Sequence, residues 1–235
     1  MPALAAVRAG SCGSDRLSDR IRLMSDKGSV ANWGRHEAVD LATDELLDAA
    51  GRAFAEVGVA RATMADVCRH AGCARSTLYR YFENRAALHL AYVNRASLRI
   101  AARLAHEVPA GTDPRSVLTE RVLFGIRAVR EDPMLASWFT PENMAVPIAL
   151  SSDSEVLAAL TEAFTDDVGL GAASAAQRET QGRWLLRSII SLLAMPVDDP
   201  DEERAVIEDF MVPPLLGEFT TSGRARRTTL EAGNG

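Results

Sequence analysis

Residues 63–82 read TMADVCRHAGCARSTLYRYF, and this stretch is the most informative part of the sequence. Thr63 can cap a short helix over 64–71, and Gly72 can end that helix because glycine readily adopts the left-handed backbone conformation. A second short helix is predicted over about 74–82. Two short helices around a tight turn form a helix-turn-helix, whose second helix can enter the major groove of DNA.

A longer helix before this stretch can support it. That helix is predicted to begin at Thr43 and to stop at Gly58, and its first turn is acidic, which the helix dipole favours. Three apolar side chains of the quoted stretch can pack against it, namely Val67, Cys73 and Leu78. Helices this short need such tertiary support.

The composition is that of an ordinary globular protein, with 235 residues of which 47% are hydrophobic and 25% are charged. No apolar run approaches the roughly 20 residues that cross a membrane. The charged amino-terminal stretch lacks the apolar segment of a secretory signal. We therefore expect a cytoplasmic protein with no membrane partner, and three cysteines without an export signal favour reduced thiols over disulfides.

The net charge of −6, taken alone, argues against a nucleic-acid partner, but the charge is unevenly distributed. Residues 43–104 carry nine basic and six acidic side chains, whereas residues 105–235 carry 11 basic and 21 acidic ones. Between Arg75 and Arg103, six arginines accompany a single acid, Glu83. This local excess favours DNA as a partner, although solvated helix faces also often carry arginine.

The remaining pattern is helical, and no alternating run predicts a strand, so the fold class is all-α. We expect a disordered extension over 1–40, a helix-turn-helix DNA-binding domain over 41–88, a larger helical effector-binding and dimerisation domain over 89–219, and a flexible tail over 220–235. Ser152 can cap one of the later helices. These helices are predicted over about 85–105, 114–130, 133–139, 152–168, 172–195 and 200–216.

The amino-terminal part resembles the tetracycline-repressor (TetR) family of bacterial transcription regulators over about residues 43–95. Many positions agree at fixed spacing, which is more specific than a bare helix-turn-helix pattern. Ser76 departs from the family, where glycine is common. The agreeing residues are Ala49, Ala50, Phe54, Gly58, Thr63, Val67, Ala71, Gly72, Thr77, Leu78, Tyr79, Tyr81, Phe82 and Leu88.

The resemblance implies a set of DNA contacts. Thr63 and the amides after it would bind a phosphate at the positive end of a helix. Arg75 would read a guanine or hold a phosphate, and one of the two tyrosines could instead pack beneath the helix. The full predicted set is Thr63, Arg75, Ser76, Thr77, Tyr79, Tyr81 and Arg85.

Bulky apolar side chains in the central helices favour an effector pocket, which the resemblance also implies. Aromatic and methionine side chains line mostly apolar pockets, although such a set also occurs as plain core. Few charges lie among them, so a lipophilic or aromatic effector is expected. The predicted lining residues are Phe124, Met134, Trp138, Phe139, Met144, Phe164 and Trp184.

The segment over 172–195 is apolar on nearly all sides, which predicts burial on two sides. One side can be the domain core and the other a second subunit, as the resemblance implies, or both can belong to a thick monomeric core. The predicted interface residues are Leu185, Ile189, Leu192, Leu193, Ile207 and Phe210.

These observations predict a homodimeric repressor that binds a palindromic DNA operator and is released by a small apolar or aromatic effector. The alternative is a helical ligand-binding or interaction protein that has lost DNA binding. We expect no metal site, because Cys68 and His70 point about 200° apart on a helix and cannot converge with Cys73. No cofactor and no enzymatic activity are expected, since no phosphate loop, nucleophile elbow or metalloprotease pair occurs.

Overall fold

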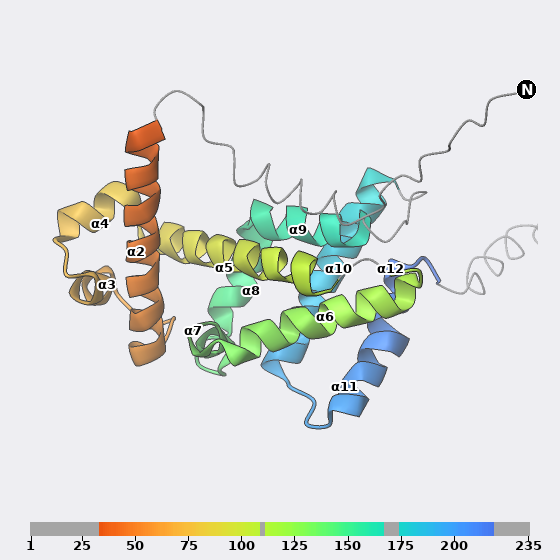
Figure 1. Cartoon of the computed structure of the whole chain (residues 1–235). Helices are drawn as coiled ribbons and strands as arrows, with labels where there is room; N and C mark the ends of the chain where they lie inside the picture. The colour runs from red at the N-terminus through yellow and green to blue at the C-terminus, as the bar shows by residue number, and fades with distance from the viewer. Residues whose placement is uncertain (1–32, 109–110, 167–173, 219–235) are drawn as a thin grey trace, which may run out of the picture.

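The computed structural model describes residues 33–108, 111–166 and 174–218, and every regular element in these ranges is helical (Figure 1). The predicted all-α class is thereby confirmed. None of the described helices is both long and apolar enough to cross a membrane. The tail predicted over 220–235 and most of the extension predicted over 1–40 lie outside the described residues.

Three of the described helices form the amino-terminal unit. Helix α2 (Trp33–Val57) is the long support, and α3 (Met64–Ala71) and α4 (Arg75–Tyr81) lie on one side of it (Figure 1). The start predicted at Thr43 is wrong, because α2 begins ten residues earlier and runs through Gly34. A single glycine costs a helix only about 1 kcal/mol, which a long helix can tolerate.

The rest of the chain forms a helical body on the other side of α2 (Figure 1). Helix α5 leaves the amino-terminal unit and enters this body. Most of these helices lie close to their predicted ranges. The elements are α5 (Arg85–Glu107), α6 (Pro114–Glu131), α7 (Pro133–Ala136), η1 (Ser137–Phe139), α8 (Ala145–Asp153), α9 (Glu155–Asp166), α10 (Ala175–Ala194), α11 (Pro200–Val206), the π turn η2 (Ile207–Met211) and α12 (Val212–Leu215).

One region differs from the prediction. The helix expected over 152–168 is preceded by α8, which the sequence did not indicate, and Ser152 lies inside α8 instead of capping a helix. The cap is Ser154, whose hydroxyl accepts a hydrogen bond from the Leu157 amide at 3.0 Å. Both serines fit the general cap preference, so residue type alone could not separate them.

Two main cores hold the molecule together. The first contains Phe54 of α2, Val67 of α3 and Leu78 of α4, and it continues into the carboxyl-terminal body through Trp138 and Leu150. The second lies among α6, α10 and the last turns of the chain. Because the first core crosses from one unit to the other, the helix-turn-helix is packed directly onto the body.

Polar contacts reinforce this junction between α2 and α5. Arg95 of α5 donates to the backbone carbonyl of Asp44 at 2.8 Å and pairs with the Asp48 carboxylate at 2.8 Å. The Arg95 side chain is only 14% exposed, so this pair is better shielded from solvent than an ordinary surface ion pair.

Candidate nucleic-acid interface and effector cavity

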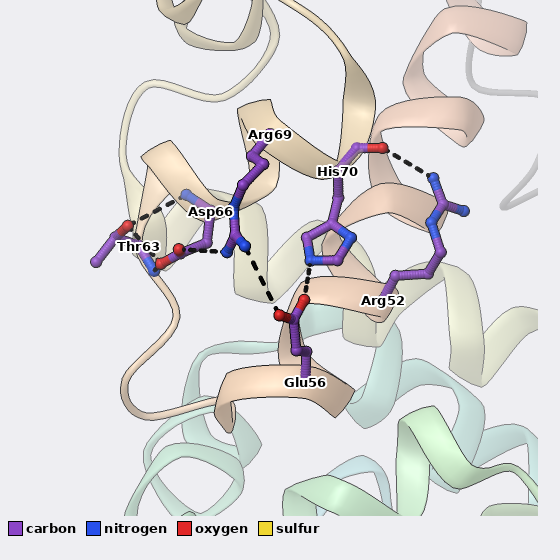
Figure 2. A network of polar contacts seen from close by, with 6 residues as sticks. All are labelled: Arg52, Glu56, Thr63, Asp66, Arg69 and His70. Atoms are coloured by element: carbon purple, nitrogen blue, oxygen red, sulfur yellow. Dashed lines mark hydrogen bonds and ion pairs between the residues drawn. The ribbon is translucent and has the colours of Figure 1, made fainter.

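Helix α3 begins with a reciprocal cap. The Asp66 amide donates to Thr63 Oγ1 at 3.2 Å, and the Thr63 amide donates to Asp66 Oδ2 at 2.9 Å (Figure 2). The Thr63 hydroxyl also donates to the same carboxylate at 2.6 Å. These hydrogen bonds from Thr63, helped by Arg69, lower the pKa of Asp66. At the other end, Gly72 has a φ of +64° and closes the helix, so both predicted ends of α3 are confirmed.

A polar network fixes α3 against α2. Arg69 bridges Asp66 of its own helix, at 2.8 Å, and Glu56 of α2, at 3.6 Å. His70 Nε2 lies 2.6 Å from the other oxygen of Glu56, and Arg52 donates to the His70 carbonyl at 3.3 Å (Figure 2). Arg69 and His70 both reach Glu56, as Figure 2 shows. The network orients the first helix of the motif, on which the second is seated.

Helix α4 presents a polar, basic outer face. Leu78 is fully buried and anchors the helix, whereas Arg75, Ser76, Tyr79 and Arg80 are exposed. No acidic residue occurs in the helix. The face therefore offers guanidinium, hydroxyl and phenol groups to a partner with acidic and acceptor atoms.

The remaining predicted residues of this helix, Thr77 and Tyr81, are less exposed. Thr77 is half-buried and lies between the outer face and α2. Tyr81 is half-buried against the first core, and the Arg80 guanidinium lies 5.2 Å from its ring centroid. Arg80 was not among the predicted contacts, but it lies in the arginine-rich stretch and is exposed on this helix. Of the two tyrosines, Tyr79 is the exposed one, at 45%.

Arg85, predicted to hold a phosphate, has a different partner in the structure. Its Nη1 donates to the carbonyl oxygens of Ala60 at 3.0 Å and Ala62 at 3.4 Å. The guanidinium therefore ties the start of α5 to the loop between α2 and α3. These contacts join residues 25 and 23 positions apart, so local sequence could not reveal them.

An apolar cavity of about 130 Å³ lies in the carboxyl-terminal body. None of its described lining residues is charged, and the Ser97 hydroxyl in its wall donates to the Val93 carbonyl at 2.8 Å. The volume is close to the roughly 150 Å³ of an engineered apolar cavity that binds benzene. The wall comes from six elements besides α5 and includes Val129, Leu135, Trp138, Phe139, Leu150, Leu157, Leu186 and Ile190.

Two of the predicted effector residues, Trp138 and Phe139, line this cavity, and four others do not. Phe124 packs with Leu104 and Ala128 in a small separate cluster. Met134 approaches α2, where its sulfur would lie 2.8 Å from a Cβ at Gly51. The wall is mainly aliphatic, so selection of aromatic and methionine residues missed most of it.

The other three predicted effector residues are placed as follows. Met144 is half-buried but outside the cavity wall. Trp184 is 44% exposed on α10 and is therefore a surface residue. The side chain of Phe164 lies outside the described residues.

The predicted dimer residues require a similar correction. Four of them are buried in the subunit's own second core: Leu185, Leu192, Leu193 and Ile207. Ile189 is half-buried and lines the cavity. Only Phe210 is left on the surface, at 70% exposure. A helix that is apolar on nearly all sides can be covered by its own chain, and α10 is covered largely by α9 and α6.

Three titratable side chains, those of His89, Tyr92 and Cys68, are buried in the first core or packed against it. Burial, and secondarily the charge of Arg85, lowers the pKa of His89 to about 4, and burial raises the pKa of Tyr92 to about 12. Burial likewise raises the pKa of Cys68, so its thiol is protonated. Within the described ranges, no three His, Cys, Asp or Glu side chains form a group that could hold a metal ion.

The sequence is similar to those of known bacterial transcriptional regulators. The pattern of the bacterial regulatory proteins of the tetR family matches residues 46–92. Two HTH-type transcriptional regulators of Mycobacterium tuberculosis, from strains CDC 1551 / Oshkosh and ATCC 25618 / H37Rv, are each 36% identical over 182 residues. The alignments cover 77% of this chain and 89% of each relative.

Solved structures show the same fold. The TetR family repressor AlkX from Dietzia sp. strain DQ12-45-1b has a TM-score of 0.54 at 22% identity, covering 73% of this chain and 93% of AlkX. A TetR transcriptional regulator from Rhodococcus sp. RHA1 has a TM-score of 0.52 at 23% identity, covering 75% of this chain and 97% of its own.

Proposed function

This chain belongs to the tetR family of bacterial regulatory proteins, and we propose that it is a repressor released from its operator by a small apolar or aromatic effector. Its relatives are transcriptional regulators and not enzymes. The proposal adds to the family assignment a palindromic operator, a homodimer and an effector class. Since bacterial DNA lies in the cytoplasm, it also assigns the protein to that compartment.

The outer face of α4 is the observation that carries the DNA-binding part. Leu78 is fully buried, so the helix is seated firmly, while Arg75, Ser76 and Tyr79 are exposed on it. A guanidinium can donate two hydrogen bonds to a guanine edge, and a phenol can donate to a phosphate. Arg75 is accordingly the base-reading candidate and Tyr79 the backbone contact.

The apolar cavity supports the effector part. The wall residues that the structure describes are all uncharged, so a charged ligand would lose its hydration without compensation from them. At about 130 Å³ it would accept a small ring or a short chain, and a larger effector would have to widen it. Repression would end by population shift, if the effector favours a subunit arrangement whose two α4 helices no longer fit one face of the DNA.

The homodimer is supported by apolar side chains that stay exposed near the end of the chain. Phe210 is 70% exposed, Met195 is 68% exposed and Trp184 is 44% exposed. A contiguous exposed apolar patch marks an association surface, and these three side chains are the candidates for such a patch. A two-fold dimer presents its recognition helices to two inverted half-sites, which is why the operator should be an imperfect palindrome.

The first experiment is selection of bound sequences from a random DNA duplex library by the purified full chain. We expect enrichment of a two-fold symmetric site. Arg75→Ala should weaken binding to that site about tenfold and relax the preference at one position of each half-site. Tyr79→Ala should weaken binding uniformly across sequences, as loss of a backbone contact does.

Arg127→Ala is the matched control, because this exposed arginine lies on α6, outside the proposed interface. It should leave the affinity unchanged. Affinity should also fall steeply with rising salt. No enrichment by folded protein at low salt would overturn the proposal and favour the alternative, a helical protein that has lost DNA binding.

A further inference from the structure

Asn143 joins the carboxyl-terminal body to the helix-turn-helix through one buried amide. It lies between η1 and α8 and is only 6% exposed. Its Nδ2 donates to the Ser137 carbonyl at 2.8 Å and to Thr140 Oγ1 at 3.1 Å. Its Oδ1 accepts a hydrogen bond from the Ala60 amide at 3.0 Å, across 83 positions of sequence.

The loop that receives this contact leads directly to the cap of α3. The Ala62 amide donates to the Gly58 carbonyl at 2.9 Å, and Gly58 has a φ of +87°. Arg85 holds the carbonyl of Ala60, while Asn143 holds its amide. The loop immediately before Thr63 is thus held by hydrogen bonds from two sides, one from α5 and one from the 140–143 turn.

The other end of the connection is the wall of the apolar cavity. Trp138 and Phe139 precede Asn143, Pro147 and Leu150 follow it, and all four line the cavity. The intervening turn is closed by hydrogen bonds from the Asn143 and Met144 amides to the Thr140 carbonyl, at 3.0 and 3.1 Å. A displacement of the wall would therefore move the Asn143 side chain with it.

We infer that Asn143 is a positioning residue that couples the filling of the apolar cavity to the setting of Thr63 and α3 at the DNA. This inference rests on the proposed function. A hydrogen bond weakens steeply with distance and misalignment, so a small shift of the wall would release the Ala60 amide. The Ala60 amide is partly shielded from water, so losing its partner would be costly and the loop would rearrange to find another one.

The test replaces the unidentified effector by a cavity-filling substitution. Leu157 of α9 lines the cavity but lies outside the 137–150 segment and outside α5. Leu157→Trp adds bulk to the cavity and should press on the opposite wall. Affinity for the selected operator duplex is measured for the wild type, Leu157→Trp, Asn143→Ala and the double variant, with folding checked by thermal unfolding.

We expect Leu157→Trp to weaken operator binding about tenfold in the wild-type background, within the usual range of allosteric coupling. In the Asn143→Ala background the same substitution should change affinity less than about twofold, the scatter expected of independent sites. Thr140→Val is the matched control, because it removes one contact of the Asn143 amide and keeps the contact with Ala60. It should preserve the tenfold response.

The outcomes separate the inference from the proposed function. An equal tenfold loss with and without Asn143 overturns the role of Asn143 and leaves control from the cavity standing. No effect of Leu157→Trp on operator affinity overturns control from the cavity, and the role of Asn143 with it. Failure of every chain to select a duplex overturns DNA binding itself.

A second readout does not depend on an Asn143 variant. Amide hydrogen exchange over residues 58–62 reports whether the Ala60 amide is held. Exchange there should be faster in Leu157→Trp than in the wild type, while the core amides of α2 are unchanged. Unchanged exchange of this loop in a variant with weakened operator binding would overturn the inference.

Discussion

Two glycines differ in backbone conformation, and this difference predicts opposite effects of the same substitution on stability. Gly72 ends α3 with a φ of +64°, whereas Gly125 lies inside α6. In both places an added Cβ would meet nothing within 4 Å, so only backbone conformation decides the effect. Gly72→Ala should lower the free energy of unfolding by about 1 kcal/mol. Gly125→Ala should raise it by up to about 1 kcal/mol, measured for both by urea unfolding.

The two variants serve as each other's control, because the chemical change is the same. A loss of stability in Gly125→Ala would mean that α6 is not regular at this point. A gain in Gly72→Ala would mean that the end of α3 differs from the structure.

His89 predicts a specific dependence of stability on pH. Its ring packs edge-on against Phe54 and Trp138, and burial lowers its pKa from 6.5 to about 4. Between these two values the unfolded chain binds a proton that the folded chain does not, so stability falls as the pH drops from 6.5 towards 4. The loss approaches about 1.4 kcal/mol per pH unit within this window.

His89→Phe keeps an aromatic ring at this position and removes the titration. The free energy of unfolding of wild type and variant should diverge below pH 6.5, with the variant losing less stability, in urea titrations at pH 7, 5.5 and 4.5. Parallel pH profiles would contradict the buried neutral state of His89.

Local signals explain which residues could be predicted. Thr63, Gly72 and Leu78 act through contacts within a few positions, and the sequence placed all three in the roles of cap, terminator and buried anchor. Arg85 and Asn143 act through partners 25 and 83 positions away. Such partners are fixed by packing, which residue type and spacing do not specify.

At the scale of an element, the reciprocal cap of α3 should matter more than its length suggests. A helix of eight residues is marginal without capping and tertiary support. Thr63→Ala removes the oxygen that accepts from the Asp66 amide, so it should lower the free energy of unfolding by about 1 kcal/mol. Operator affinity should fall as well, because the helix-turn-helix would be less ordered.

Thr63→Ser is the control for this change, since it retains the hydroxyl oxygen. It should stay within about 0.5 kcal/mol of the wild type in thermal unfolding. Equal losses in the alanine and serine variants would show that the methyl group, and not the cap, is responsible.

Helix boundaries and helix partners differ in how far sequence could predict them. The ends of α3 carry strong cap and stop signals. Helix α2, in contrast, begins before Thr43, because one glycine, Gly34, does not end a supported helix. The apolar circumference of α10 predicted burial on two sides, and the structure fills much of both sides from the same chain. The apolar pattern of a helix predicts which of its faces are buried. It does not predict whether the same chain or a second subunit covers them.

At the scale of the whole molecule, the continuous first core makes the two units one mechanical body. Phe54 of α2 meets Trp138 edge-on with ring centroids 5.4 Å apart, and Tyr92 of α5 stacks on the same indole at 5.5 Å. Trp138 in turn lines the cavity. The wall of the cavity therefore packs directly against the amino-terminal unit.

Phe210 lies on the surface of the chain, within the last turns that the structure describes. Phe210 is 70% exposed in the single chain, so replacing it should hardly disturb the fold of one subunit. If Phe210 is buried between two subunits, Phe210→Glu places a charge in an apolar interface and should dissociate the dimer. Sedimentation equilibrium should then give about half the mass of the wild type, with an unchanged helical signal in circular dichroism.

Ile148→Glu is the control, because Ile148 is also exposed, at 55%, but lies on α8, away from the end of the chain. It should leave the mass unchanged. A two-fold site requires both recognition helices, so Phe210→Glu should also weaken binding to the full operator far more than binding to a single half-site. Equal masses for Phe210→Glu and the wild type would remove Phe210 from the interface and direct the search to Trp184 and Met195, the other exposed apolar residues near it in sequence.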